Sequence, residues 1–290
     1  MLARQSQFDM QKIHSIDLNL TINSGQVFLW NKIGDIWFGI DGEDLLAISE
    51  PFKIISPSRK INRFFREDDD LSKILSEIEK DDLVKSAVKD FSGLRLMRQD
   101  PFQCYISFIC SSNSSIQNIK RMLENLCKKF GDEMEFDKRL FFTFPKPEIL
   151  SDASNKDLLS CGLGFRAKYV KQAAKMANLE KINFASLRKE NYKSALETLK
   201  TVPGIGNKIA DCILLFSLDK LESFPLDRWT QRILKKYYPK IFGDMQGKSL
   251  TEKKYSELHE KIVKYFGSYA GYSQQFLFKM ERDLYKKNWL

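Results

Sequence analysis

Histidine and cysteine are scarce in this sequence, and their scarcity excludes several kinds of site. The 290 residues include two histidines, His14 and His259, and five cysteines. The stretch HEKIV, which begins at His259, lacks the second histidine of a zinc-protease helix. The cysteines are odd in number and form no CxxC pair, which disfavours a disulfide framework, a four-cysteine zinc site and an iron–sulfur cluster. We expect reduced, mostly buried thiols, no metal and no cofactor, with acid–base chemistry carried by Lys, Asp or Glu.

Long hydrophobic runs are also missing. The longest, IADCILLFSL, is about half as long as a membrane-spanning helix needs to be. The N-terminal MLARQSQFDM has no apolar core of the length found in signal peptides. A hydrophobic content of 43% and 22 phenylalanines nevertheless indicate a folded chain with a substantial core. We expect an intracellular monomer without a membrane partner, in the cytoplasm or nucleoid, or in the nucleus of a eukaryote.

Acidic residues are outnumbered by basic ones. Lysine and arginine total 47 against 38 aspartates and glutamates, which gives a net charge of +9. This excess suits a polyanionic partner such as nucleic acid, although many lysine-rich chains are simply well solvated. A nucleotide-phosphate loop is not indicated, because the two glycines of GIGNK are too closely spaced and the third glycine of a dinucleotide turn is absent.

Two kinds of periodicity divide the chain. Between residues 15 and 57, the segments IDLNLTI, QVFLWNKI, DIWFGID, DLLAISE and FKIIS are rich in β-forming residues and alternate with SG, GD and DG turns. From about residue 62 the apolar residues recur at helical spacing, and almost everything after Asp100 follows that pattern. We predict an α+β fold: a small antiparallel β-rich N-terminal domain with flanking helices (1–95), packed on a larger all-helical domain (96–290).

A glycine-containing hairpin joins two helices of the predicted helical domain, over about residues 196–216. In LKTVPGIGNKIADCILLF, one helix ends near Thr201 and the next begins near Asn207. Between them a proline, Gly204 and Gly206 form a tight turn. Backbone N–H groups exposed at such a helix start can hold a DNA phosphate without reading its sequence. The alternative is an ordinary helix–helix turn.

Lys208 falls in the first turn of the second helix of this hairpin. A cation there faces the positive end of the helix dipole, and if it is also desolvated the neutral amine is favoured and can attack carbon. Cys212 follows one helical turn later on the same face. The alternative is a plain surface lysine, which is the commoner fate of one residue among 47 Lys and Arg.

Asp227 follows Pro225 and precedes Arg228 and a helical pattern, RWTQRIL. An aspartate in that place is commonly an N-cap, whose carboxylate accepts hydrogen bonds from the helix backbone. A capping carboxylate is held rigidly at the mouth of its helix. The capping role and a catalytic role for Asp227 are therefore compatible.

The segment VPGIGNKIADCILLFSLDKLESFPLDRW (202–229) resembles the helix–hairpin–helix and Gly/Pro–Asp motif of base-excision DNA glycosylases. The resemblance narrows to the 8-oxoguanine DNA glycosylases and extends from about Ile16 to Phe278. Four further segments resemble parts of those glycosylases in the same order: SGQVFLW (24–30), DPFQCYISFICSSNSSIQNI (100–119), CGLGFRAKYV (161–170) and YAGYSQQFLF (269–278).

The resemblance implies a bifunctional glycosylase and AP lyase that acts on double-stranded DNA containing oxidised guanine. It assigns Lys208 as the nucleophile that attacks C1′ of the deoxyribose and Asp227 as the catalytic aspartate. An amine can form an imine with the opened sugar and promote β-elimination of the 3′ phosphate, whereas a hydroxyl or thiol cannot. A carboxylate near C1′ stabilises the positive charge that develops there.

The resemblance also implies a pocket for the base, which must be flipped out of the duplex. Gln274 would contact the Watson–Crick edge, while Phe278 and Cys212 would cover the two flat faces. Gly25 would aim its backbone carbonyl at N7, which is an acceptor in guanine but carries hydrogen in 8-oxoguanine. The alternatives are a core-facing Phe278 with an amide one helical turn away, and a simple SG turn between strands.

Contacts to the DNA around the lesion are implied as well. Asn113 would fill the gap left by the flipped base, Phe165 would wedge beside it, and Arg166 would read the orphaned cytosine. Asn118 stands where eukaryotic members have a second cytosine-reading arginine, so we expect a looser preference for cytosine. Trp229 stands where many members have a phosphate-binding histidine. The remaining expected DNA contacts are Gly204, Gly206 and Arg228.

Three other functions compete with this interpretation. Relatives that remove alkylated bases share the β domain and the hairpin but generally lack a lysine nucleophile, so Lys208 argues against them. Adenine- and pyrimidine-directed relatives usually carry a four-cysteine iron–sulfur loop, which is missing here. A non-catalytic helix–hairpin–helix module would need the phosphate-binding turn but not Lys208, Asp227, Gln274 and Phe278 together.

Overall fold

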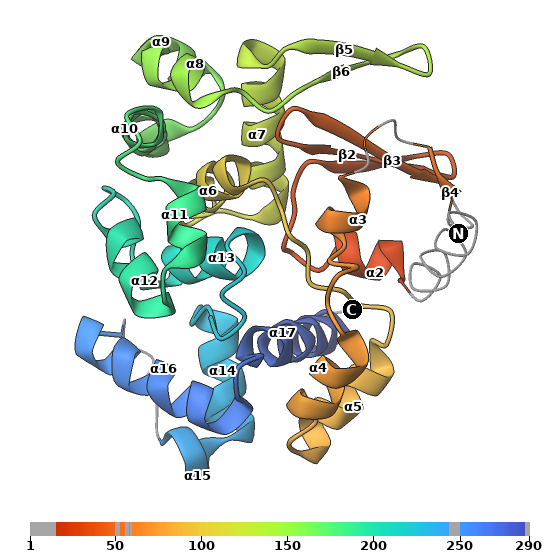
Figure 1. Cartoon of the computed structure of the whole chain (residues 1–290), viewed down its shortest axis with the longest axis vertical. Coiled ribbons are helices and arrows are strands. Elements are labelled where there is room, and N and C mark those ends of the chain that lie inside the picture. Colours follow the sequence, from red (N-terminus) through yellow and green to blue (C-terminus); the bar gives the residue numbers. More distant parts are fainter. Residues whose placement is uncertain (1–15, 50–52, 56–57, 59, 244–249, 288–290) are drawn as a thin grey trace.

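The computed structural model describes residues 16–49, 53–55, 58, 60–243 and 250–287. Helices make up most of the chain, and an antiparallel sheet formed by the N-terminal part lies beside them (Figure 1). The α+β fold class predicted from the sequence is therefore confirmed.

Four strands form the N-terminal sheet. In order across the sheet they are β1 (Trp30–Ile33), β2 (Ile36–Asp41), β3 (Asp44–Ser49) and β4 (Lys53–Ile54). Each strand pairs antiparallel with the next, and two-residue turns join the first three. Gly34 and Gly42 in those turns have φ values of +60° and +63°, a conformation that favours glycine and agrees with the predicted GD and DG turns.

The first segment predicted as a strand is wrong: it forms a helix, α2 (Leu18–Ile22). The alternation of apolar and polar residues in IDLNLTI favours a strand, but Asp17 favours a helix start. Its Oδ1 accepts a hydrogen bond from Leu20 N at 2.8 Å and so caps the first turn. The buried side chains of α2 also recur at i, i+3 and i+4, which is helical spacing.

Helices follow from residue 61 onward, as the change in periodicity predicts. Those of the N-terminal part are α3 (Ile61–Phe64), α4 (Leu71–Ile78) and α5 (Asp82–Asp90). Those of the larger part are α6 (Pro101–Cys110), α7 (Ile116–Phe130), α8 (Pro147–Asp152), α9 (Asn155–Ser160), the short 3₁₀ helix η1 (Gly164–Arg166), α10 (Ala167–Asn178), α11 (Phe184–Lys189), α12 (Tyr192–Lys200), α13 (Asn207–Ser217), α14 (Arg228–Tyr237), α15 (Pro239–Phe242), α16 (Glu252–Phe266) and α17 (Ala270–Lys287).

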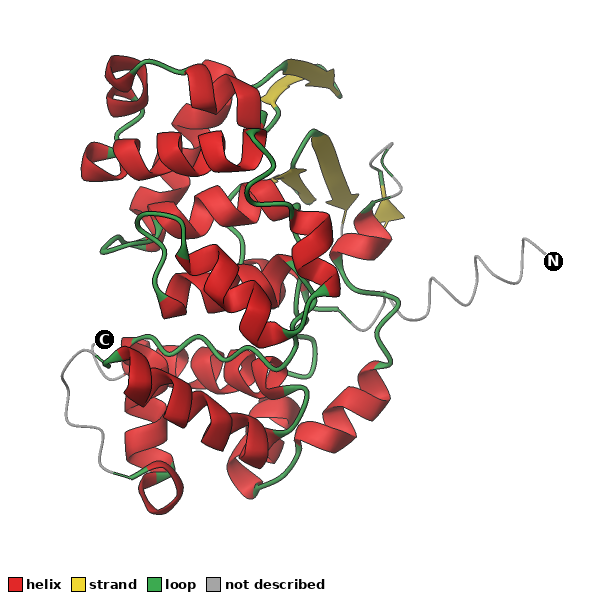
Figure 2. Cartoon of the chain, turned by 60° about the vertical axis from the view of Figure 1, so that its left-hand side comes forward, coloured by secondary structure: helices red, strands yellow, loops and turns green. Residues whose placement is uncertain are grey.

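A two-stranded hairpin interrupts the helical part, and the helical periodicity does not predict it. Strands β5 (Glu133–Phe136) and β6 (Arg139–Phe142) pair antiparallel, with Asp137 and Lys138 as the two-residue turn. Both turn residues have positive φ, 50° and 58°, as a tight hairpin turn of this length requires. The hairpin and the four-stranded sheet lie at the same end of the molecule (Figures 1 and 2).

One buried core runs through both parts of the chain. It joins sheet residues such as Phe38 to helical residues such as Phe108 and Leu277. Helix α17 packs against α14 and α5, and α13 packs against α6 and α12, so elements from both parts converge on the last helix (Figure 1). The division of the chain at residue 95 stays a prediction.

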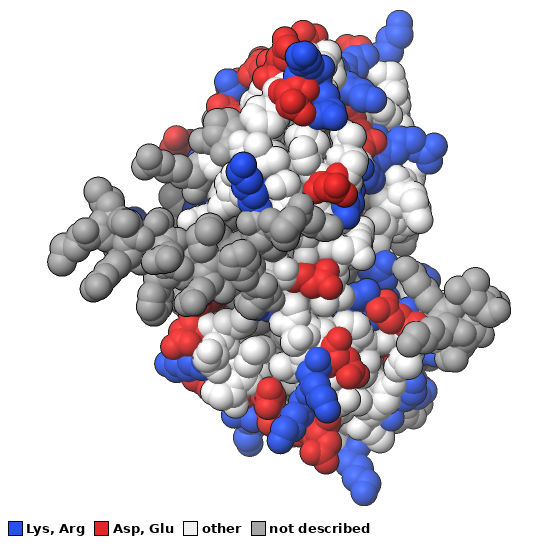
Figure 3. Space-filling model, turned by 90° about the vertical axis from the view of Figure 1, so that its right-hand side faces the viewer, with Lys and Arg blue, Asp and Glu red and all other residues white. Residues whose placement is uncertain are grey.

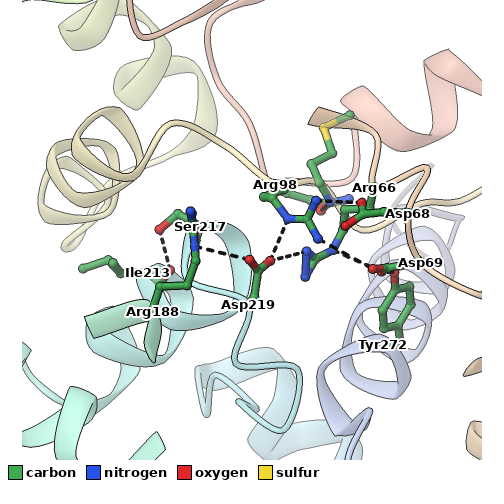
Figure 4. A network of polar contacts seen from close by, with 11 residues as sticks. Arg66, Asp68, Asp69, Arg98, Arg188, Ile213, Ser217, Asp219 and Tyr272 are labelled. Carbon is green, nitrogen blue, oxygen red and sulfur yellow. Dashed lines mark hydrogen bonds and ion pairs between the residues drawn. The ribbon is translucent and has the colours of Figure 1, made fainter. Parts of the chain in front are cut away.

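A network of arginines and carboxylates connects the N-terminal part to the C-terminal end of α13 (Figure 4). Asp219, which follows α13, accepts hydrogen bonds from Arg66 Nη1 at 2.6 Å and from Arg98 Nε at 2.7 Å. Nε of Arg188 lies 3.3 Å from Asp219 Oδ2, and its Nη2 donates to Ser217 O at 2.5 Å. Three guanidinium groups around one carboxylate thus hold α13 at this end, through charge-assisted contacts that are stronger than neutral ones.

Charged side chains of both signs are interspersed on the face shown in Figure 3. The excess of positive charge therefore does not gather into one basic surface on the visible part of that face. None of the helices in the described ranges has the length and apolarity needed to span a membrane. The same residues contain no group of three or more His, Cys, Asp or Glu side chains placed to hold a metal ion.

Candidate active site

Helices α12 and α13 form the predicted helix–hairpin–helix. Gly204 in the connecting turn has a φ of +91°, and a Cβ there would lie 2.8 Å from the ring of Tyr169, so the position requires glycine. Gly206 is the N-cap of α13 and is exposed. Because glycine supplies no side-chain acceptor, the first backbone N–H groups of α13 are left for an external acceptor such as a phosphate.

Lys208 lies in the first turn of α13 and is half-buried. Its Nζ lies 5.6 Å from the ring centroid of Phe108, which stacks on Phe216. Cys212, one turn later, is buried, and burial raises the pKa of its thiol to about 12, while the charge of Lys208 opposes that rise. A thiol with a raised pKa is a poor nucleophile, which leaves Lys208 as the candidate nucleophile on this face of α13.

Asp227 is the N-cap of α14, as the sequence predicts. Its Oδ1 accepts hydrogen bonds from Trp229 N at 2.9 Å, from Thr230 N at 2.9 Å and from Thr230 Oγ1 at 3.2 Å. All three donors bind the same oxygen, so capping fixes the carboxylate through Oδ1 alone. Helix capping and chemistry can therefore share this side chain.

A buried cluster of hydroxyl groups ties α13 to the loop before α14. The carboxylate of Asp211 in α13 accepts hydrogen bonds from Tyr192 Oη, at 2.8 Å, and from Tyr255 Oη. Tyr255 Oη also accepts from Leu226 N at 3.2 Å. Burial raises the pKa of Asp211 to about 7, while the two tyrosine hydroxyls lower it. The cluster fixes α13 relative to the loop that carries Asp227.

Lys208 and Asp227 line the same open cleft, whose volume is about 930 Å³. Gly25 and Phe278 line it as well, so four residues predicted for the site share one cavity. The walls come from α2 and the segment after it, from α6 and α7, and from α13, α14 and α17. The cleft therefore opens where the N-terminal part meets the helical part.

Gly25 forms part of the cleft wall, in the segment between α2 and β1. Its φ is +94°, and a Cβ there would lie 2.9 Å from Arg282 Nη1 and 3.5 Å from Phe278 Cε1. The turn is held by Ser24 Oγ, which donates to a carbonyl of α2 at 2.7 Å and accepts from Gln26 Nε2 at 2.9 Å. The backbone conformation thus favours glycine, and the turn presents bare backbone to the cleft.

Gln274 and Phe278 lie one helical turn apart in α17. Phe278 reaches the cleft, whereas Gln274 is 4% exposed and lies behind the cleft lining. Within the described residues, the buried Oε1 of Gln274 has no hydrogen-bond partner. Such an unpaired acceptor costs about 1–3 kcal/mol. A ligand that donates a hydrogen bond to this oxygen would remove that cost.

Arg166 supports the turn that carries Asn113, which is exposed and has a φ of 49°. Nε of Arg166 donates to Ser112 O at 2.9 Å, and its Nη2 donates to Asn113 O at 3.0 Å. The guanidinium Cζ also lies 4.4 Å from the ring centroid of Phe165, whose side chain is exposed. The expected contact of Arg166 with cytosine stays a prediction, and Nη1 is the nitrogen that these carbonyls leave for it.

Asn118 in α7 already has partners for both ends of its amide. Its Nδ2 donates to Ser114 Oγ at 2.8 Å, and its Oδ1 accepts from Arg121 Nη2 at 3.1 Å. Apart from buried Arg166 and partly buried Asn118, the residues expected to contact DNA outside the base pocket are exposed, as such contacts require. They are Asn113, Phe165, Gly204, Gly206 and Arg228.

Arg282 and Phe108 are among the residues of the cleft that were not predicted from the sequence. Arg282 continues the four-residue spacing of Gln274 and Phe278 by one more turn, so the signal was present. Phe108 lies in a run of nine consecutive buried residues of α6, where no periodicity distinguishes one side chain from the next.

Comparison with known proteins identifies the class. Residues 106–261 match the HhH-GPD superfamily of base excision DNA repair proteins, and residues 9–105 match the N-terminal domain of 8-oxoguanine DNA glycosylase. The first match alone covers more than half of the chain. The chain therefore belongs to the HhH-GPD superfamily of base excision DNA repair proteins.

Within this superfamily, the chain is similar to proteins named as OGG1-type or 8-oxoguanine glycosylases. The chain is 31% identical to N-glycosylase/DNA lyase OGG1 of Arabidopsis thaliana, over 94% of this chain and 80% of the relative. It is similar to MBOgg1 in complex with a low-affinity DNA ligand, with a TM-score of 0.83, 30% identity and 93% of each chain covered. The Clostridium acetobutylicum 8-oxoguanine glycosylase/lyase, in complex with double-stranded DNA containing cytosine opposite 8-oxoG, gives a TM-score of 0.83 and 28% identity, over 94% of this chain and 93% of that one. The resemblance stated from the sequence is confirmed.

Proposed function

We propose that this protein removes 8-oxoguanine from duplex DNA and then cleaves the strand at the resulting abasic site. The observation that carries the proposal is the placement of Lys208 and Asp227 on one cleft, with Gly25 and Phe278 in its walls. A module that only binds DNA has no need of such a cleft. The glycosylase and lyase activities named for the relatives support the same reaction.

Lys208 supplies the amine for this reaction. The unprotonated Nζ attacks C1′ while the bond between C1′ and N9 breaks, and the electron pair of that bond leaves with the base. Loss of a proton from Nζ and opening of the sugar ring give an imine, which permits β-elimination of the 3′ phosphate. Asp227, fixed through its Oδ1, stabilises the positive charge that develops at C1′.

Gly25 and Gln274 support recognition of an oxidised guanine. The backbone carbonyl of Gly25 accepts a hydrogen bond from N7–H of 8-oxoguanine and repels the lone pair on N7 of guanine. The unpaired Oε1 of Gln274 is an acceptor, and the Watson–Crick edge of a guanine-type base offers two donors, N1–H and the N2 amine. Phe278 covers one flat face of the flipped base and Cys212 the other.

The partner in this reaction is double-stranded DNA containing oxidised guanine. The protein works as a monomer, because the residues assigned to the reaction all come from one chain. The chemistry uses lysine and aspartate side chains and requires no cofactor. A protein with this substrate acts where the chromosome lies, in a nucleoid or a nucleus.

Borohydride trapping on a labelled duplex with 8-oxoguanine opposite cytosine tests the proposal. Borohydride reduces the imine and fixes the protein to the DNA, so a covalent adduct is expected with the lesion duplex and not with its guanine counterpart. Base release without an adduct would indicate a glycosylase that lacks a lysine nucleophile. Binding with neither release nor adduct would indicate a non-catalytic DNA-binding module.

A further inference from the structure

Arg282 lies one helical turn beyond Phe278 in α17 and lines the cleft. Its guanidinium Cζ lies 5.4 Å from the ring centroid of Phe278. Its Nη1 lies 3.4 Å from Ser24 O and 2.9 Å from the point where a Cβ of Gly25 would be. The guanidinium group therefore occupies the space beside Gly25 that a side chain would otherwise fill.

Arg282 also responds to the charge of Asp227. Burial lowers the pKa of the Arg282 guanidinium, while the carboxylates of Asp283 and Asp227 raise it. Arg282 thus lies beside Gly25, at the wall assigned to the base, and lines the same cleft as Asp227, at the place assigned to the sugar. The cation is partly buried there, and a hydrogen bond from it would be stronger than one made in water.

The structure of 8-oxoguanine decides which atom faces such a group. In the five-membered ring, C8 lies between N7 and N9, and N9 carries C1′ of the sugar. The exocyclic O8 therefore points into the sector between N7 and C1′. A base whose N7–H faces Gly25, and whose C1′ lies near Asp227, turns its O8 toward the part of the cleft between these two residues, and Arg282 lines that cleft beside Gly25.

We propose that Arg282 donates a hydrogen bond to O8 of the flipped base and stabilises the negative charge that leaves with it. This inference rests on the proposed function. As the bond between C1′ and N9 breaks, its electron pair passes to the base and spreads over N9, C8 and O8. The guanidinium keeps its own protons, and the departing base takes up the proton that Lys208 Nζ loses. Arg282 thereby contributes at the base, and Asp227 contributes at the sugar.

Support of the Gly25 turn alone does not account for Arg282. Its contact with Ser24 O, at 3.4 Å, is long for a hydrogen bond. The same turn already has the two shorter bonds of Ser24 Oγ, at 2.7 and 2.9 Å. The partly buried guanidinium in the cleft wall therefore has donor capacity that the turn does not use.

Single-turnover kinetics with two duplexes test the proposal. The first duplex contains 8-oxoguanine opposite cytosine, and the second contains a preformed abasic site, which has no O8. Arg282→Met is expected to slow base excision about 10- to 100-fold, below the loss typical of a full oxyanion donor because O8 carries only part of the charge. Cleavage of the abasic duplex is expected to stay within twofold of the parent rate.

Lys261→Met serves as the control, because Lys261 is exposed on α16 and its loss removes the same charge from the protein. Arg282→Gln is a second variant that keeps a neutral donor, and its excision rate should fall between those of the parent and of Arg282→Met. Unchanged excision in both Arg282 variants, or equal slowing on both duplexes, would overturn the inference. If the parent protein itself neither excises the base nor traps with borohydride, the proposed function has failed instead.

Discussion

The two ends of helix α13 are held in opposite ways. At its C-terminal end, Ser217 O accepts a hydrogen bond from Arg188, and Asp219 is surrounded by Arg66, Arg98 and Arg188 (Figure 4). These guanidinium groups come from three separate segments of the chain, so this end of the helix is fixed to distant parts of the fold. A cation beside the last carbonyls of a helix also complements the negative end of its dipole.

Helix α13 is tied less firmly at its N-terminal end, where Nδ2 of Asn207 donates one exposed hydrogen bond to Glu252 Oε2 at 3.0 Å. It begins at Gly206, which supplies no capping side chain, and Lys208 lies over the ring of Phe108 and reaches the cleft. One 11-residue helix thus has an anchored end and a reactive end. The C-terminal end thus fixes the position of the helix, and the N-terminal end carries the lysine expected to react. Variants at the C-terminal end should therefore lower stability, and variants at the N-terminal end should lower activity.

Lys208→Gln should produce the largest effect, at the reactive end. Imine trapping and strand cleavage are expected to vanish, because an amide cannot form the imine. Binding to lesion DNA and the free energy of unfolding should change little, since the phosphate and pocket contacts remain. Gel-shift, trapping and denaturation measurements on the same preparation check this. Appreciable cleavage by the variant would show that another group is the nucleophile.

Asp227→Asn should slow base release by about 100- to 1000-fold, because the charge that stabilises C1′ is lost. Its stability should change by only a few tenths of a kcal/mol, because asparagine is nearly as good a helix cap. Single-turnover excision and urea denaturation measure the two quantities. An unchanged excision rate would leave Asp227 with its capping role alone.

Asp219→Ala tests the anchored end, and its effect should appear in stability rather than in chemistry. Removing the carboxylate leaves the guanidinium groups of Arg66 and Arg98 with Asp69 as their remaining shared partner, at a cost of about 1–3 kcal/mol. Asp68→Ala is the matched control: its exposed carboxylate also pairs with Arg98, and its loss should cost less than about 1 kcal/mol. Equal decreases in the free energy of unfolding of the two variants would show that Asp219 does not anchor this end of the helix.

Asp211, in the middle of α13, should make stability depend on pH. Its pKa in the folded protein is about 7, above the ordinary value of 3.8, so the folded state holds a proton that the unfolded state has released. Stability from this group is therefore present below about pH 4 and is lost as pH rises to 7, at up to about 1.4 kcal/mol per pH unit. Asp211→Asn should make the fall shallower in denaturation series at several pH values. Parallel curves for parent and variant would contradict this.

The two residues expected to face the opposite base, Arg166 and Asn118, both have hydrogen-bond partners within the protein. Arg166 is bonded to backbone carbonyls, and Asn118 can present either a donor or an acceptor. We expect excision of 8-oxoguanine opposite all four bases, with a modest preference for cytosine. Asn118→Arg should increase that preference by the 1–3 kcal/mol typical of one good base contact. Single-turnover rates on the four duplexes decide it, and a strong cytosine preference in the parent would show the expectation wrong.

The features of the fold that could be predicted are those that depend on a few neighbouring residues. The hairpin glycines, the helix start at Asn207 and the N-cap at Asp227 each depend on residues within a few positions, and the structure has all three. The segment Leu18–Ile22 was wrongly predicted as a strand, because its alternation of apolar and polar residues competed with the helix-capping signal of an aspartate. The β5–β6 hairpin was not predicted, because its side chains are only partly buried and its sequence has little apolar periodicity.

The residues of the candidate site also differ in how far they could be predicted from local sequence. The motif around Lys208 and Asp227 is contiguous in sequence, and both residues do line one cleft. The partners of Arg166 are carbonyls more than 50 residues away, and no pattern of side chains encodes a backbone acceptor. The anchoring role of Asp219 likewise depends on arginines from three segments, which only the folded chain brings together.

The five cysteines of the chain are all buried as free thiols, as the sequence predicts. Burial raises the pKa of each of them: Cys104, Cys110, Cys127, Cys161 and Cys212. Oxidants such as peroxide react with the thiolate, so these sulfur atoms are kept in their least reactive form and out of reach. Guanine is oxidised under the same conditions that inactivate proteins with exposed thiolates. The buried thiols of this repair protein should therefore resist oxidation under the conditions that oxidise guanine.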